Sequence, residues 1–226
     1  MRQGSPAPYG AAAGAAGVVL FVVGTLVIGE RPGFDASGAE IAANLDENRR
    51  RIQLGCAILA AWTPLFVWFL ATVVSLAGEA GVGPRRAATV AFGCGLVFSS
   101  LFLVDVTALA VSALRPGNMA ADPQLAVALR DFEWLAMGSG AFVVTGMMAS
   151  LAALVLGHGA VWPRWIGWLA VVAGSLYLLR VGTLVATDGA FAADGILGLY
   201  VPVTAVAGWV LIASVNHWFE KRLDGG

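Results

Sequence analysis

A single arginine interrupts an otherwise apolar segment, Leu176-Tyr177-Leu178-Leu179-Arg180-Val181-Gly182-Thr183-Leu184. An arginine near the middle of a bilayer costs about 2.5–3.5 kcal/mol on insertion scales, so it usually has a partner or a function. Residues 101–109 repeat the order of leucine, aromatic and aliphatic residues around Asp105. We therefore expect Asp105 to be the partner of Arg180, inside a bundle of membrane-spanning helices.

The composition is that of a membrane protein. The 226 residues are 59% hydrophobic and 12% charged, with a mean hydropathy of +0.82, whereas soluble domains carry about 25% charged residues. Six apolar runs of roughly 19–28 residues can each cross a hydrocarbon core of about 30 Å. They lie near residues 11–29, 52–78, 87–114, 134–157, 166–186 and 195–218. The prediction is an all-α polytopic membrane bundle of six transmembrane helices in one domain, with a short disordered lead (1–10) and a polar tail (219–226).

The charges of the loops give the orientation. The side of the termini carries Arg2, Arg85, Arg86, Arg164, Lys221 and Arg222, and the other side carries Arg31, Arg49, Arg50, Arg51, Arg115 and Arg130. Basic residues are thus balanced, but most of the acids lie opposite the termini. Because short basic loops with few acids are typical of the cytoplasmic side, we expect both termini on the cytoplasmic side of the membrane.

The longest connection runs from Glu30 to Arg51 and has the pattern of a helix start. Ser37 followed by Glu40 matches a capping box, and Ile41 and Leu45 lie one helical turn apart. The pattern predicts a short interfacial helix that could act as a lid. The alternative is a solvated connector that runs into the second span.

An internal repeat relates the second and third spans to the fourth and fifth. A shift of 79 residues aligns Gly78, Val82, Pro84 and Arg85 with identical residues, and removal of four residues then aligns Asp105 with Arg180. The pattern predicts two copies of one hairpin in the same orientation. Opposite charges at equivalent positions would then meet near the axis that relates the copies.

The charged residues define a candidate site near the face opposite the termini. Asp105 and Arg180 lie about 14 Å and 9 Å along their helices from that face, where Glu133 opens the fourth span. In a polar cavity, Asp105 or Glu133 could donate a proton and Arg180 could hold an anionic or oxygen-bearing group. Tyr177 shares the helical side of Arg180. Aromatic side chains that could complete the cavity, and stabilise a carbocation, are Trp62, Phe102, Trp134 and Tyr200.

Other kinds of site are not indicated. His158 and His217 are far apart in the sequence, so no haem or zinc site is expected, and neither a metal nor a cofactor is predicted. Cys56 and Cys94 begin antiparallel spans, which predicts two free thiols rather than a disulfide. The expected partners are the lipid bilayer and a lipophilic small molecule, and no nucleic acid.

Two resemblances bear on function. The segment Trp162-Pro163-Arg164-Trp165-Ile166-Gly167-Trp168-Leu169, with Asn48-Arg49-Arg50-Arg51 and the closing run 209–215, resembles six-span actinobacterial membrane proteins of unknown function. This resemblance implies a bacterial inner membrane and no particular chemistry. In size and in the use of carboxylic acids among helices, the chain is also similar to small membrane-embedded terpene cyclases, although no motif is matched residue by residue.

The sequence therefore supports one functional hypothesis and two alternatives. The hypothesis is an enzyme, a cyclase or isomerase, that acts on an isoprenoid-like substrate by acid catalysis with Asp105 or Glu133 as the proton donor. The alternatives are a small transporter and a non-enzymatic assembly partner in which an Asp105–Arg180 ion pair is a structural latch.

Overall fold

The computed structural model describes residues 7–186 and 188–223, and the described part is helical without strands. The α-helices are α1 (Ala7–Ile28), α2 (Gly38–Glu47), α3 (Arg49–Ala80), α4 (Val82–Leu114), α5 (Pro116–Ala121), α6 (Pro123–Ser139), α7 (Ala141–Ala152), α8 (Arg164–Leu178) and α9 (Val201–Leu223). Four short turns of other helix types complete the fold: η1 (Ala153–Gly157), η2 (Leu179–Leu184), η3 (Gly189–Phe191) and η4 (Ile196–Tyr200).

Six segments are long and apolar enough to cross a membrane, which confirms the predicted six-helix bundle. They are α1, α3, α4, the run from α6 to η1, the run from α8 to η2, and the run from η3 into α9. The spans form a closed ring in which α1 packs on α3, α3 on α4, α4 on α7, α7 on α8, α8 on α9, and α9 on α1. This ring encloses the charged residues identified in the sequence.

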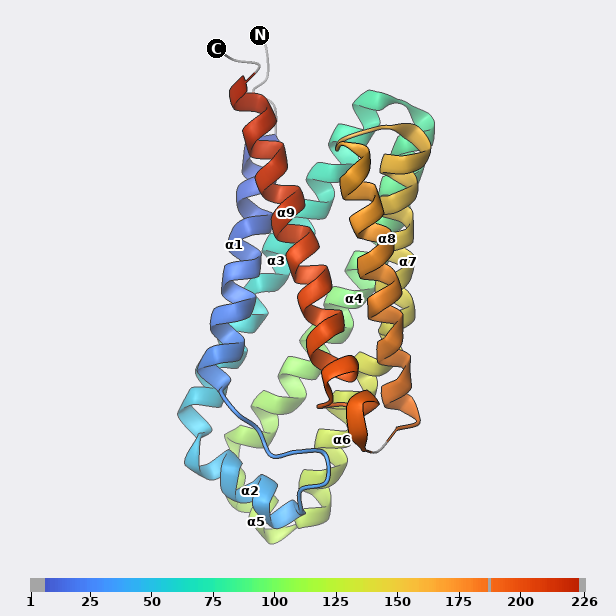
Figure 1. The fold of residues 1–226 in the computed structure, drawn as a ribbon. Coiled ribbons are helices and arrows are strands. Elements are labelled where there is room, and N and C mark those ends of the chain that lie inside the picture. Colours follow the sequence, from blue (N-terminus) through green and yellow to red (C-terminus); the bar gives the residue numbers. More distant parts are fainter. Residues whose placement is uncertain (1–6, 187, 224–226) are drawn as a thin grey trace.

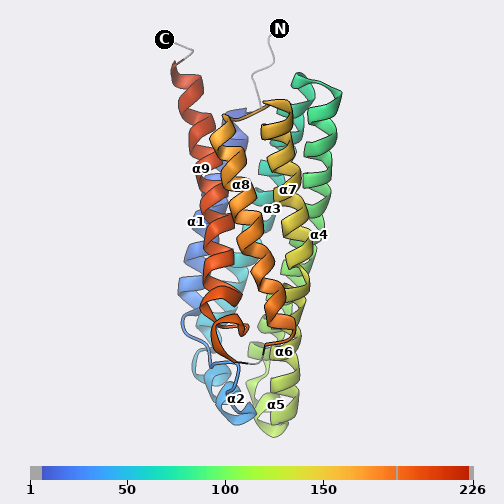
Figure 2. The same ribbon diagram turned by 45° about the vertical axis from the view of Figure 1, so that its right-hand side comes forward.

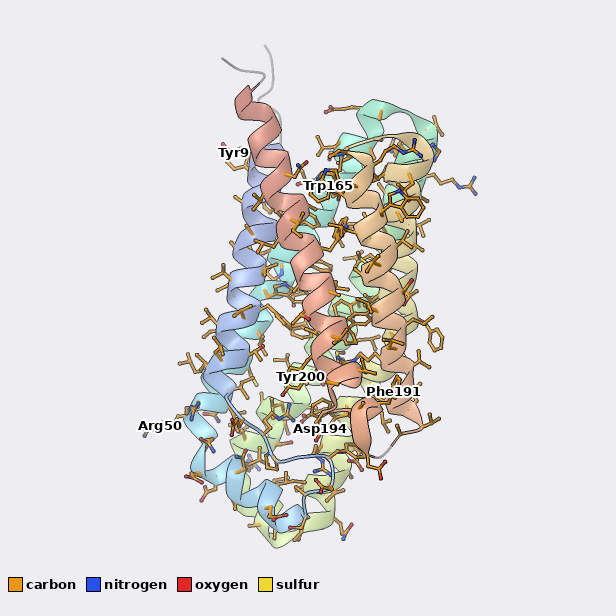
Figure 3. The ribbon with its side chains drawn as sticks, in the orientation of Figure 1. Tyr9, Arg50, Trp165, Phe191, Asp194 and Tyr200 are labelled. Carbon is orange, nitrogen blue, oxygen red and sulfur yellow. The ribbon has the colours of Figure 1, made fainter. Side chains whose placement is uncertain are left out.

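The two ends of the bundle differ. Helix α1 starts and α9 finishes at the same end, whereas α2, α5 and the connection from α1 to α2 cover the opposite end (Figure 1). Exposed aromatic side chains occur toward both ends, with Tyr9 and Trp165 near the termini and Phe191 and Tyr200 at the other end (Figure 3). Aromatic residues favour the two membrane–water interfaces, so this distribution fits a bundle that spans the bilayer.

The predicted start of α2 is confirmed. Glu40 donates its backbone N–H to Ser37 Oγ at 3.3 Å, and Ser37 donates its backbone N–H to Glu40 Oε2 at 2.8 Å, which completes the capping box. The Glu40 carboxylate accepts hydrogen bonds from the backbone N–H and from the hydroxyl of Ser37, and these two hydrogen bonds lower the pKa of Glu40. Ile41 and Leu45 are buried against the bundle, so the connection is a packed helix and not a solvated connector.

Two predicted boundaries are wrong. Helix α6 runs without a break from Pro123 to Ser139, so the fourth span begins before the predicted residue 134. Asp122 caps its N-terminus by accepting a hydrogen bond from the backbone N–H of Leu125 at 3.3 Å. The first span starts at Ala7, so residues 7–10 are helical rather than part of a disordered lead; residues 1–6 lie outside the described part. At the other end of the chain α9 continues to Leu223, and residues 224–226 of the predicted polar tail lie outside the described part.

The predicted internal repeat is not confirmed. The pair of α3 and α4 consists of two continuous helices that meet at Gly81. The second pair is interrupted: α6 ends at Gly140, α7 winds into the π-helical turn η1, and α8 winds into the 3-10 turn η2 that carries Arg180. The duplication therefore stays a prediction from the sequence.

The contact between α1 and α3 depends on glycine, which gives a first testable prediction. A Cβ atom at Gly55 would meet Ile28 and lie 2.9 Å from the backbone oxygen of Gly24. Small residues let helix backbones approach closely in lipid, and overpacking of such a contact costs about 1–3 kcal/mol. We expect Gly55→Ala to lower the melting temperature in detergent by several degrees.

The matched control is Gly93→Ala on α4, where an added Cβ would have no atom within 4 Å. Alanine is a better helix former than glycine by about 1 kcal/mol, so the control is expected to melt at the same temperature as wild type or slightly higher. Equal melting temperatures for the two variants would contradict the close packing of α1 on α3.

Candidate functional site

Glu133 on α6 is paired with Arg31, which follows α1 by three residues. Arg31 Nη2 donates to Glu133 Oε2, and the two side chains are 29% and 4% exposed, respectively. The guanidinium carbon of Arg31 also lies 5.6 Å from the centre of the Trp134 ring, a cation–π distance. The structure places the candidate residues Glu133 and Trp134 beside Arg31, to which the sequence assigned no role.

A second arginine, Arg130, is buried one turn before Glu133 on α6 and binds the connection from α1 to α2. It donates to the backbone oxygens of Gly33 at 2.7 Å, Phe34 at 2.8 Å and Ala36 at 3.4 Å. Its guanidinium also lies 5.3 Å from the centre of the Phe34 ring. In the sequence Arg130 looked like an ordinary loop charge, because its partners are carbonyl groups that no side-chain pattern reveals.

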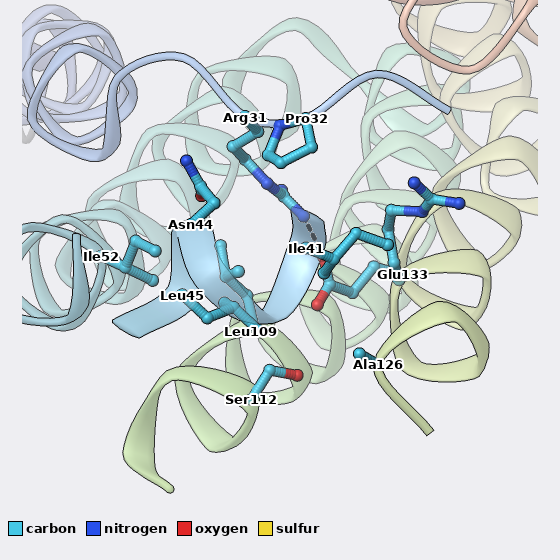
Figure 4. Close-up of a pocket in the computed structure, with 11 residues that line it drawn as sticks. Arg31, Pro32, Ile41, Asn44, Leu45, Ile52, Leu109, Ser112, Ala126 and Glu133 are labelled. Carbon is cyan, nitrogen blue, oxygen red and sulfur yellow. Dashed lines mark hydrogen bonds and ion pairs between the residues drawn. The ribbon is translucent and has the colours of Figure 1, made fainter. Parts of the chain in front are cut away.

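A small pocket lies between these arginines, α2 and α4 (Figure 4). It is lined by Arg31, Pro32, Ile41, Asn44, Leu45, Ile52, Leu109, Ser112, Ala126, Arg130 and Glu133. The free space for a water-sized sphere is about 20 Å³, which is enough for about one water molecule. In this conformation the pocket is therefore water-sized and lined by both charged and apolar side chains, and it is too small for an isoprenoid.

Asp105 and Arg180 lie deeper in the bundle than this pocket. Asp105 precedes the pocket residue Leu109 by one helical turn on α4 and is half-buried. Arg180 on η2 is 4% exposed, and its Nε has no hydrogen-bond partner. The charged groups close enough to act electrostatically on Asp105 are Glu133, Arg31 and Arg180.

The expected ion pair between Asp105 and Arg180 is not formed. Among the described residues, the ion pairs are Arg31 with Glu133 and Arg130 with Asp131. The turn η2 that carries Arg180 packs mainly on α6 and η4, whereas α4 has α3 and α7 as its neighbours around the ring (Figure 2). Arg180 is therefore a buried cation without a salt-bridge partner in the described part of the chain.

Aromatic residues of four helices form a cluster next to these charges. Trp62 on α3 lies at the centre, with ring-to-ring distances of 4.8 Å to Phe102 on α4 and 5.9 Å to Phe21 on α1. Phe98 on α4 extends the cluster to Tyr177 on α8, whose ring centre is 6.3 Å away. Both Asp105 and Arg180 are close enough to Tyr177 to act on it electrostatically. The structure thus brings Trp62, Phe102 and Tyr177 together, as the sequence predicted.

Tyr200 does not belong to this group. It ends the π-helical turn η4 and is 60% exposed, on the outer surface of the bundle (Figure 3). Trp134 is partly buried beside Arg31, and its Nε1 has no hydrogen-bond partner. The described residues contain no group of three or more histidine, cysteine, aspartate or glutamate side chains that could hold a metal ion.

Comparison with protein-family models, with curated proteins and with solved structures finds no match for this chain. The similarity to membrane-embedded terpene cyclases therefore gains no support from these comparisons. The function has to be inferred from the geometry and chemistry of the site.

Proposed function

We propose that this integral membrane protein binds a lipophilic molecule at Arg180 and acts on it by proton transfer from Asp105. The observation that carries the proposal is the burial of Arg180 without an ion-pair partner among the described residues, with its Nε unsatisfied. A charge inside a bilayer is expensive unless it is compensated. An anionic or oxygen-bearing group of a bound molecule would supply that compensation.

The surroundings of the two candidate acids favour Asp105 as the proton donor. Glu133 is paired with Arg31, whereas Asp105 has no ion-pair partner among the described residues. A general acid has to reach the substrate with its proton, and an unpaired carboxyl group meets that requirement better than one held in a salt bridge. In this proposal Glu133 and Arg31 hold the end of the bundle together, and Asp105 faces the substrate.

The aromatic cluster suits an isoprenoid-like substrate. Protonation of a carbon–carbon double bond by Asp105 produces a carbocation, which the ring faces of Trp62 and Phe102 could stabilise. Loss of a proton from a neighbouring carbon back to the Asp105 carboxylate then forms a new double bond. Cyclisation or isomerisation by this route balances without another reactant. The reaction would take place in a bacterial inner membrane, with both termini on the cytoplasmic side.

Mass spectrometry of lipid extracts tests the proposal. Extracts of natural host cells that make the wild-type protein are compared with extracts of cells that make Asp105→Asn at equal membrane abundance. Loss of a general acid lowers a reaction rate by about 10²-fold at the lower end of the usual range. The abundance of a lipid species is therefore expected to change by at least about tenfold. Asp188→Asn is the matched control, since Asp188 is an exposed acid at the same end of the bundle. Indistinguishable extracts from wild type and Asp105→Asn would overturn the proposal.

Transport is the second candidate function. The connection from α1 to α2 closes one end of the charged interior, and polar contacts hold it there. A transporter in its occluded state would also have such a closed end. Substrate-dependent flux into sealed vesicles without a product of changed mass would favour transport over the enzyme.

A further inference from the structure

We propose that residues 29–37 together with α2 form a lid over the charged interior, and that Arg130 is the positioning residue that keeps this lid closed. This inference rests on the proposed function, because the lid would control the access of the lipophilic molecule to Asp105 and Arg180. Figure 1 shows the connection crossing the end of the bundle from α1 toward α6 and the start of α9.

The shape of the connection depends on Arg130. Between Gly29 and Ser37 the chain forms no helix, and within it a single backbone hydrogen bond joins the N–H of Ala36 to the oxygen of Gly33. The buried guanidinium of Arg130 instead binds the oxygens of Gly33, Phe34 and Ala36. Hydrogen bonds to charged groups are among the stronger ones in proteins. Removal of this guanidinium would leave the connection without its central support.

Two further polar contacts attach the connection to different parts of the bundle. The backbone N–H of Phe34 donates to Asp194 Oδ2 at 2.9 Å, just before η4, and Arg31 binds Glu133 on α6. All three attachments are made by groups that water can also satisfy. Residues 29–37 can therefore leave the bundle at a smaller cost than an apolar core element could, while displacement of α2 also exposes the buried Ile41 and Leu45.

The lid covers the groups that the proposed function needs. Ile41 and Leu45 of α2 line the pocket on the lid side, while Leu109 and Ser112 line it on α4, one and two turns beyond Asp105. The closed pocket holds about one water molecule. A lipophilic substrate that arrives from this end can reach Asp105 only after the lid has moved.

A native cysteine beneath the lid makes this movement measurable. Cys56 on α3 is 3% exposed and lies one helical turn from Ile52, which lines the pocket. In a Cys94→Ala background, Cys56 is the single thiol of the chain. The rate of its modification by a small charged methanethiosulfonate reagent, with the protein in detergent, measures how often the lid opens.

Arg130→Gln is expected to raise the modification rate of Cys56 by about tenfold or more, since it removes charged hydrogen bonds that hold the lid. The matched control is Arg50→Gln on the same side of the bundle, because Arg50 is exposed and points outward (Figure 3). Its rate is expected to equal that of the parent. Equal Cys56 rates in Arg130→Gln and Arg50→Gln would overturn the proposal.

Cys94 distinguishes lid opening from general loosening of the bundle. In a Cys56→Ala background, Cys94 reports on α4 beside Gly146, and Arg130→Gln is expected to leave its rate unchanged. A parallel rise at both cysteines would contradict a local lid.

If Arg130→Gln does not fold, Asp194→Ala serves in its place. A smaller rise in the modification rate of Cys56 is expected for this variant. An unchanged rate would overturn the proposal. These rates need no substrate, so failure of the lid and failure of the proposed reaction are separate results.

Discussion

Arg31→Gln is expected to lower the free energy of unfolding in detergent by about 3 kcal/mol, because it leaves the Glu133 carboxylate buried without its partner. Glu133→Gln is expected to cost less. It leaves Arg31, whose side chain is 29% exposed against 4% for Glu133, and a partly exposed guanidinium can still be hydrated. The free energies are obtained from reversible unfolding of the purified protein.

The double variant Arg31→Gln/Glu133→Gln completes the cycle. It is expected to recover part of the loss of Arg31→Gln, with a coupling energy of about 0.5–3 kcal/mol between the two positions. Additive losses would mean that the salt bridge contributes nothing beyond the two separate side chains, and would contradict the geometry at this end of the bundle.

Arg180→Met is expected to have the opposite effect on stability. Arg180 is buried and has no ion-pair partner among the described residues, so an apolar side chain of similar length removes an uncompensated charge. The gain is expected to be about 2–3 kcal/mol, as on insertion scales, and is visible as a higher melting temperature of the ligand-free protein. Function is expected to be lost at the same time.

The matched control for this variant is Arg164→Met, at the exposed start of α8. No gain is expected there, since an exposed arginine is already hydrated. The latch hypothesis makes a different prediction for Arg180, because loss of one partner of a buried ion pair destabilises a protein. A lower melting temperature of Arg180→Met would therefore support a latch and contradict the unpaired Arg180 of this structure.

The sequence predicted the features that depend on local patterns. The six spans followed from the length of the apolar runs, and the start of α2 followed from Ser37 and Glu40 three residues apart. Trp62, Phe102 and Tyr177 were assigned to one site and do lie in one aromatic cluster. Each of these features is determined by residues near one another in the chain or by their depth in the bilayer.

The features that the sequence could not predict depend on how the helices are arranged around the ring. Asp105 and Arg180 were expected to meet because their depths agree, but depth does not specify which elements are neighbours, and the turn η2 that carries Arg180 packs mainly on α6 and η4. The partner of Glu133 proved to be Arg31, which is 102 residues away in the chain. Arg130 binds backbone carbonyls, and every residue of a chain has such a group, so no residue pattern identifies this contact.

Native mass spectrometry tests the central claim most directly, namely that buried Arg180 holds a lipophilic molecule. The wild-type protein and Arg180→Met are purified from the natural host in the same mild detergent and compared for bound species. The expected result is a discrete lipophilic adduct on the wild-type protein and on Arg164→Met that is absent from Arg180→Met. The same adduct on Arg180→Met, or none on any of the three proteins, would contradict a binding site at Arg180.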